Sequence, residues 1–114
     1  MNNKEKGEIG EKIASKYLLS KGAEILENNY RIKSGEVDII AKLDNELIFV
    51  EVKSRSSIRY GYPSESVNYN KIKKITNTAK YYILKNNLYN VPIRFDVVEI
   101  YLSEHRINHI VNAF

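Results

Sequence analysis

The chain has 114 residues, with 18 Lys and Arg against 14 Asp and Glu, and it has no cysteine. This length suits one domain with its own core, which we expect over residues 1–114. The lack of cysteine excludes disulfides and thiolate zinc sites. No apolar run reaches membrane-spanning length, so we expect a cytoplasmic protein with no membrane partner.

The first half of the chain predicts one helix and three strands. Apolar residues recur at helical spacing from Ile9 to Leu18, which predicts a helix over about residues 4–20 that Gly22 ends. Residues 23–31 indicate a strand, followed by a turn at Ser34-Gly35. Residues 37–43 and 46–55 are rich in Val and Ile, and Asp44-Asn45 between them is typical of a β-hairpin.

The second half predicts a loop, a helix and two strands. The expected ranges are 56–66 for the loop, 70–84 for the helix, and 93–102 and 106–111 for the strands. Asp96 is expected to be buried by pairing with Arg94 or a tyrosine. His105 and His109 are read as ordinary surface or edge positions of a strand. The order α-β-β-β-α-β-β predicts an α/β or α+β fold with a mixed sheet.

Residues 51–90 are basic and rich in tyrosine. They hold eight Lys or Arg against two Glu, a net charge of +6 in a chain whose total is +4, and six of the nine tyrosines. This mixture favours nucleic acid as the partner, while a solvated basic helix is the alternative. The candidate nucleic-acid contacts are Arg55, Lys71, Lys73, Lys74, Tyr60 and Tyr62.

Two acids and a lysine lie inside the apolar runs of the expected hairpin. Glu51 and Lys53 share a face, because side chains alternate along a strand. With a two-residue turn at Asp44-Asn45, Asp38 lies opposite Glu51. Opposed like charges destabilise a sheet, so a bound cation would explain the pair. Two carboxylates on a Mg²⁺ or Mn²⁺ ion, beside a lysine, are the parts of a metal-dependent phosphodiesterase.

Other acids extend this candidate site. Glu36 shares the face of Asp38 and is a possible further ligand or water-positioning acid. Glu11 is expected to approach from the first helix, because Gly10 before it lets that helix pack close to a strand. Pairs of the form Glu-x-Lys also occur by chance on exposed strands, so an ordinary charged surface is the alternative.

The spacing Asp-x12-Glu-x-Lys resembles the signature of the PD-(D/E)XK nucleases, the restriction-endonuclease-like superfamily. More narrowly, the chain resembles the YraN family of small bacterial proteins described as predicted endonucleases. The motifs that carry the resemblance are Gly10-Glu11-x-x-Ala14, Asn29-Tyr30-Arg31, Gly35-Glu36-Val37-Asp38-Ile39-Ile40-Ala41, Phe49-Val50-Glu51-Val52-Lys53-x-Arg55, Gly61-x-Pro63-x-Glu65-Ser66-Val67, Lys71 and Arg94-Phe95-Asp96-Val97-Val98.

The resemblance implies a restriction-endonuclease-like mixed sheet flanked by helices, with an α-β-β-β-α-β core. It further implies that Glu11, Asp38 and Glu51 associate with a metal and that Lys53 is catalytic. The family is similar to archaeal Holliday-junction resolvases, which are dimeric, so a homodimer is a further expectation. One departure is that Asp38 follows Val37 where the superfamily signature has proline.

Three functions are compatible with these observations. The leading hypothesis is a Mg²⁺- or Mn²⁺-dependent endonuclease acting on DNA, with branched or single-stranded repair and recombination intermediates as candidate substrates. The second is an inert nucleic-acid-binding module of the same fold, because fold alone does not establish activity. The third, a protein-interaction domain, fits the basic, tyrosine-rich segment less well.

Overall fold

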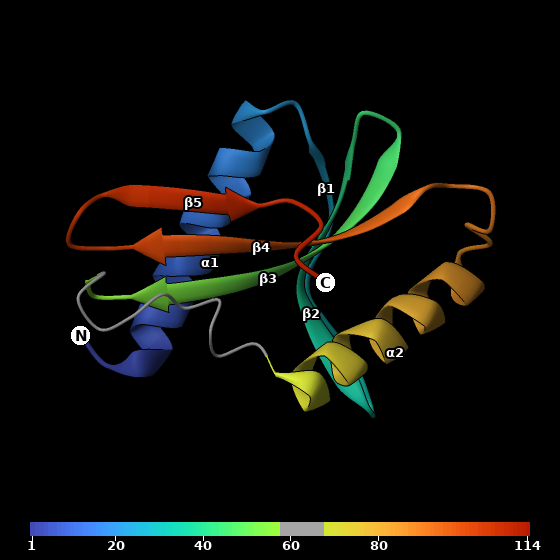
Figure 1. Cartoon of the computed structure of the whole chain (residues 1–114), viewed down its shortest axis with the longest axis horizontal. Coiled ribbons are helices and arrows are strands. Elements are labelled where there is room, and N and C mark those ends of the chain that lie inside the picture. The colour runs from blue at the N-terminus through green and yellow to red at the C-terminus, as the bar shows by residue number, and fades with distance from the viewer. Residues whose placement is uncertain (58–67) are drawn as a thin grey trace.

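The computed structural model describes residues 1–57 and 68–114 (Figure 1). In chain order the elements are α1 (Asn3–Ser20), β1 (Glu24–Ile32), β2 (Gly35–Leu43), β3 (Glu46–Arg55), α2 (Tyr69–Lys85), β4 (Ile93–Tyr101) and β5 (Arg106–Ile110). Each lies within two residues of the range that the sequence predicts. Residues 58–66 of the expected loop lie outside the described residues.

The five strands form one mixed sheet in the order β1-β2-β3-β4-β5. Neighbours are antiparallel except β3 and β4, which run parallel and are joined through α2. The helices cover opposite faces, α1 mainly behind β3 and α2 mainly over β2 (Figure 1). The fold is therefore α/β, a mixed sheet flanked by helices, and it is compatible with a restriction-endonuclease-like core.

Each face of the sheet has its own core. On the α1 face, Ala14 and Leu18 pack with buried strand residues such as Val50. On the α2 face, Ile75 and Ala79 of the helix pack with strand residues such as Phe49. β3 is buried on both faces, as expected of the central strand of such a sheet. Neither described helix combines the length and the apolar character needed to cross a membrane.

Local signals account for most element ends. Asp44 and Asn45 both have positive φ, 51° and 67°, as a two-residue hairpin turn of type I′ requires. Gly22 follows α1 with φ 94°, which confirms its role at the helix end. The turn predicted at Ser34-Gly35 is wrong by one residue. Gly35 instead begins β2, pairs with Ile32, and lies against α2.

Asp96 lies at the centre of a buried polar cluster on the α1 face. Its carboxylate accepts hydrogen bonds from Arg94 at 3.0 Å and binds His109 Nε2 at 2.7 Å, while His109 Nδ1 lies 3.0 Å from the Tyr17 hydroxyl. The predicted burial of Asp96 against Arg94 is confirmed. His109 is no ordinary strand position, because it links β5 through Tyr17 to α1.

Candidate active site

The two acids of the candidate site lie where β2 and β3 separate. The antiparallel pairing runs from Leu43 opposite Glu46 to Ile39 opposite Val50, in the register that the sequence predicts. Beyond this point β2 continues to pair with β1 as far as Gly35, while β3 continues beside β4. The two halves of the sheet thus form a fork (Figure 1), and Asp38 and Glu51 are the first residues inside it.

Asp38 lies at the inner end of the fork, where β2 and β3 begin to separate. Its Oδ2 accepts a hydrogen bond from the backbone N–H of Val52 at 2.8 Å, where a continuing ladder would have used a β2 carbonyl. The carboxylate therefore replaces a ladder bond and turns toward β3. Burial raises the pKa of Asp38 above its ordinary value, and the Val52 N–H opposes this rise.

Glu51 is the more buried acid, with a side chain only 4% exposed. Burial and then repulsion from Asp38 raise its pKa from 4.5 to about 7, against the opposing effect of Lys71 and Lys53. The Lys53 ammonium lies 3.7 Å from Glu51 Oε1, and the Lys71 ammonium, which comes from α2, lies 3.5 Å from the same oxygen. Near neutral pH Glu51 therefore holds a proton far more readily than an ordinary glutamate does.

Glu11 approaches the site from α1, as the sequence predicts. A Cβ on Gly10 would lie 1.7 Å from Ser54 Oγ, so only glycine allows α1 to approach the end of β3 so closely. Burial, and then the charge of Asp38, raise the pKa of Glu11. Glu11, Lys53 and Arg55 line a cavity of about 290 Å³ between the start of α1 and the end of β3.

The expected metal ligands are only partly brought together. In the described ranges, 1–57 and 68–114, no three His, Asp or Glu side chains are arranged as a metal-binding group. Asp38 and Glu51 adjoin each other, whereas Glu11 is linked to them through the charge of Asp38, which adds to the effect of burial in raising the pKa of Glu11. Two carboxylates are the donors that the fork itself supplies.

The remaining predicted residues lie around the fork and differ in their exposure and in their partners. Glu36 is held by Arg31, whose guanidinium lies 2.8 Å from Glu36 Oε2, and its charge still affects Asp38. Arg55 and Lys73 are exposed, on β3 and α2 respectively. Tyr60 and Tyr62 lie outside the described residues.

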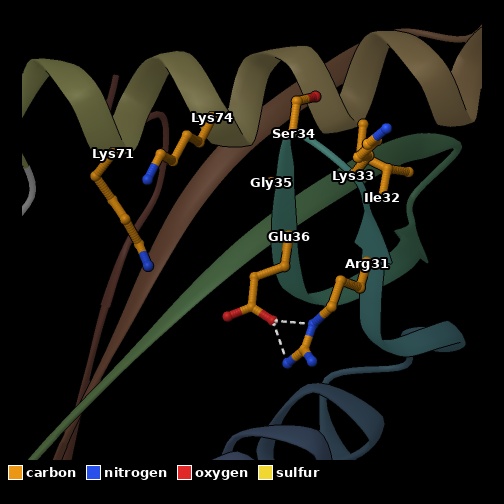
Figure 2. Close-up of a pocket in the computed structure, with 8 residues that line it drawn as sticks. All are labelled: Arg31, Ile32, Lys33, Ser34, Gly35, Glu36, Lys71 and Lys74. Atoms are coloured by element: carbon orange, nitrogen blue, oxygen red, sulfur yellow. Dashed lines mark hydrogen bonds and ion pairs between the residues drawn. The ribbon is translucent and has the colours of Figure 1, made fainter.

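Two basic residues beside the site are missing from the sequence prediction. Arg31, near the end of strand β1, and Lys33, in the β1–β2 turn, line a groove of about 490 Å³ together with Lys71 and Lys74 (Figure 2). The available signal was the spacing of two residues between Arg31 and Lys33, which is the spacing of neighbours on one side of an extended chain.

Known proteins match the chain over most of its length. The family described as "Uncharacterised protein family UPF0102" matches residues 10–100. A UPF0102 protein of Clostridioides difficile (strain 630) is 70% identical over 114 residues, covering 100% of both chains. A UPF0102 protein of Clostridium acetobutylicum is 50% identical, covering 98% of this chain and 95% of its own. One from Caldanaerobacter subterraneus is 45% identical, covering 100% and 98%.

Proposed function

The chain belongs to the UPF0102 family, and from this premise we propose that it is a metal-dependent endonuclease of the PD-(D/E)XK type, acting on DNA in the cytoplasm. The observation that supports this most directly is the carboxyl pair of Asp38 and Glu51 at the fork, with Lys53 beside it. Burial raises the pKa of both acids, and Asp38 raises that of Glu51 further. Such a pair is costly to a fold unless a ligand uses it.

Mg²⁺ or Mn²⁺ fits the donor atoms of this site. Mg²⁺ keeps several of its waters and binds proteins through one or two carboxylates, which is what Asp38 and Glu51 offer. Glu11 is the acid on α1 that would complete the set. When bound, such an ion supplies an activated water and neutralises phosphate charge.

The side chains around the acids have separate roles in this proposal. Lys53 stabilises the negative charge that develops on the scissile phosphate. Its side chain is 20% exposed, so it can contact both Glu51 and a substrate. Arg55, exposed further along the same strand, binds a neighbouring phosphate. Glu36 is the additional acid that positions water.

The test is cleavage of end-labelled DNA by the full chain in Mg²⁺ and in Mn²⁺. The substrates are a single strand, a duplex, a flap, a fork and a four-way junction. Asp38→Asn and Glu51→Gln are expected to reduce cleavage by about a hundredfold or more, as for loss of an essential electrostatic group, while DNA affinity falls no more than a few fold. Asp44→Asn, in the exposed hairpin turn, is the matched control and keeps full activity.

The outcomes separate the site from the activity. Cleavage by the native chain that persists unchanged in Asp38→Asn overturns the assignment of the site. Cleavage of no substrate in either metal overturns the enzyme proposal itself.

Two observations favour a second function. Lys71 and Lys53 already offset the charge of Glu51, and the described residues contain no three-ligand metal group. An inert nucleic-acid-binding module would have these properties. It predicts salt-sensitive DNA binding without turnover, so the same assay with a binding measurement distinguishes the two functions.

A further inference from the structure

A groove lined by basic residues lies outside the acid pair, between the β1–β2 hairpin and α2. The groove has a volume of about 490 Å³ (Figure 2). Its lining residues are Arg31, Ile32, Lys33, Ser34, Gly35, Glu36, Lys71 and Lys74.

Backbone atoms form the floor of the groove, because Gly35 has no side chain and lies directly under α2. A Cβ on Gly35 would lie 2.7 Å from the Lys74 carbonyl oxygen and 2.8 Å from Thr78 Oγ1. At this point the main chain of the hairpin therefore packs directly against the main chain of α2. Side chains of the hairpin and of α2 extend from this contact and form the two walls, as Figure 2 shows for Lys71 and Lys74.

The charge of the groove is strongly positive. Of its described lining residues four are cationic, and Glu36 is the one acid. Arg31 neutralises Glu36 with hydrogen bonds from Nε at 3.0 Å and from Nη2 at 2.8 Å. Lys71 is paired with Glu51. The charges of Lys33 and Lys74 are thus left to attract an anion from solvent, and both side chains are exposed.

Lys71 connects this groove to the acid pair. It lines the groove, and its ammonium also lies 3.5 Å from Glu51 Oε1. A polyanion in the groove therefore comes within one lysine side chain of the proposed reaction centre. A single small anion would need only one or two of these cations, whereas a chain of phosphates can use all of them.

We propose that this groove binds the sugar-phosphate backbone of the nucleic-acid strand that leads to the acid pair, with Lys33 and Lys74 as phosphate contacts. The inference rests on the proposed function and adds to it the path of the substrate. Because the cations meet phosphates and not base edges, binding through the groove has little sequence preference.

The experiment measures the affinity of labelled single-stranded and duplex oligonucleotides by fluorescence anisotropy, without divalent metal, over a range of KCl concentrations. The groove variant is Lys33→Gln with Lys74→Gln. The matched control is Lys21→Gln with Lys42→Gln, which removes the same charge from two exposed lysines, one directly after α1 and one near the C-terminal end of β2. All four are surface positions, so we expect each variant to fold, which its circular dichroism spectrum checks.

When two phosphate contacts are lost, the slope of log K against log salt concentration for single-strand binding becomes shallower by about 1.4. Near 0.1 M salt this corresponds to a loss of affinity of about 25-fold. We expect this loss in the groove variant and a change of less than about threefold in the control. Equal weakening of both variants overturns the groove while leaving nucleic-acid binding intact. Equally tight binding of polyglutamate by the native chain also overturns it, because it would show a general polyanion surface. Failure of the native chain to bind any oligonucleotide overturns the proposed function as well.

Discussion

Replacing Glu51 by Gln is expected to stabilise the metal-free fold at high pH. Folding raises the pKa of this carboxyl from 4.5 to about 7, and each pKa unit is worth about 1.4 kcal/mol. Between these values the folded chain binds a proton that the unfolded chain has released, so the free energy of unfolding falls as pH rises through this window. Ionising Glu51 in the folded state therefore costs about 3 kcal/mol above pH 7, as an upper value. A neutral Gln avoids this cost.

Urea unfolding at about pH 4, below the window, and at about pH 8, above it, tests the reasoning. The variant should match the native chain near the lower pH and exceed it by up to about 3 kcal/mol at the higher pH, a rise in Tm of about 10 °C for a domain of this size. Glu24→Gln, at an exposed position of β1, is the control and should change stability by less than about 0.5 kcal/mol at both values. An equal effect of Glu51→Gln at both pH values would refute the argument, because the stabilisation would then not come from ionisation.

Three further predictions follow from other parts of the fold. Mn²⁺ at about a hundred times its Kd should stabilise the native chain by about 2.7 kcal/mol but not Asp38→Asn; an equal Tm shift in both would place the ion elsewhere. Gly10→Ala should cost about 1–3 kcal/mol through its contact with Ser54, in urea unfolding, and Ser54→Gly should recover part of this loss. Gly7→Ala, where a Cβ meets nothing within 4 Å, should be neutral or stabilising. Asp96→Asn should cost about 3–5 kcal/mol at neutral pH, because it leaves a guanidinium without its buried partner; a loss below about 1 kcal/mol would show that the cluster relaxes.

Local patterns were enough to predict the elements and the proximity of the two acids, which lie one position beyond the last paired residues of the hairpin. The two positive-φ positions of a type I′ turn suit Asp44 and Asn45, and that turn sets the register of the whole hairpin. The position of Asp38 relative to Glu51 is therefore a local property of residues 38–51. Glycine at position 10 likewise indicated a close helix contact, and the structure identifies Ser54 as the neighbour.

The features that sequence reasoning missed depend on contacts between distant segments. The pairing of Lys71 with Glu51 requires that α2 cross over the sheet and return its first turn to β3. The groove needs the β1–β2 turn to meet the middle of α2 at Gly35. The Asp96 cluster brings together three elements, and no spacing along the chain indicates that His109 should contact Tyr17.

The parallel pairing of β3 with β4 has a consequence for the order of folding. It joins Leu47 to Ile93, 46 positions later, whereas the β2–β3 hairpin closes over two residues. Distant contacts form more slowly than local ones because closing a long loop costs entropy, so the hairpin carrying both acids is expected to form first, still hydrated. Docking of β4 and α2 then removes Glu51 from water. The electrostatic cost of burying Glu51 beside Asp38 is thus incurred in a late folding step, and alkaline solution should slow refolding where mild acid speeds it.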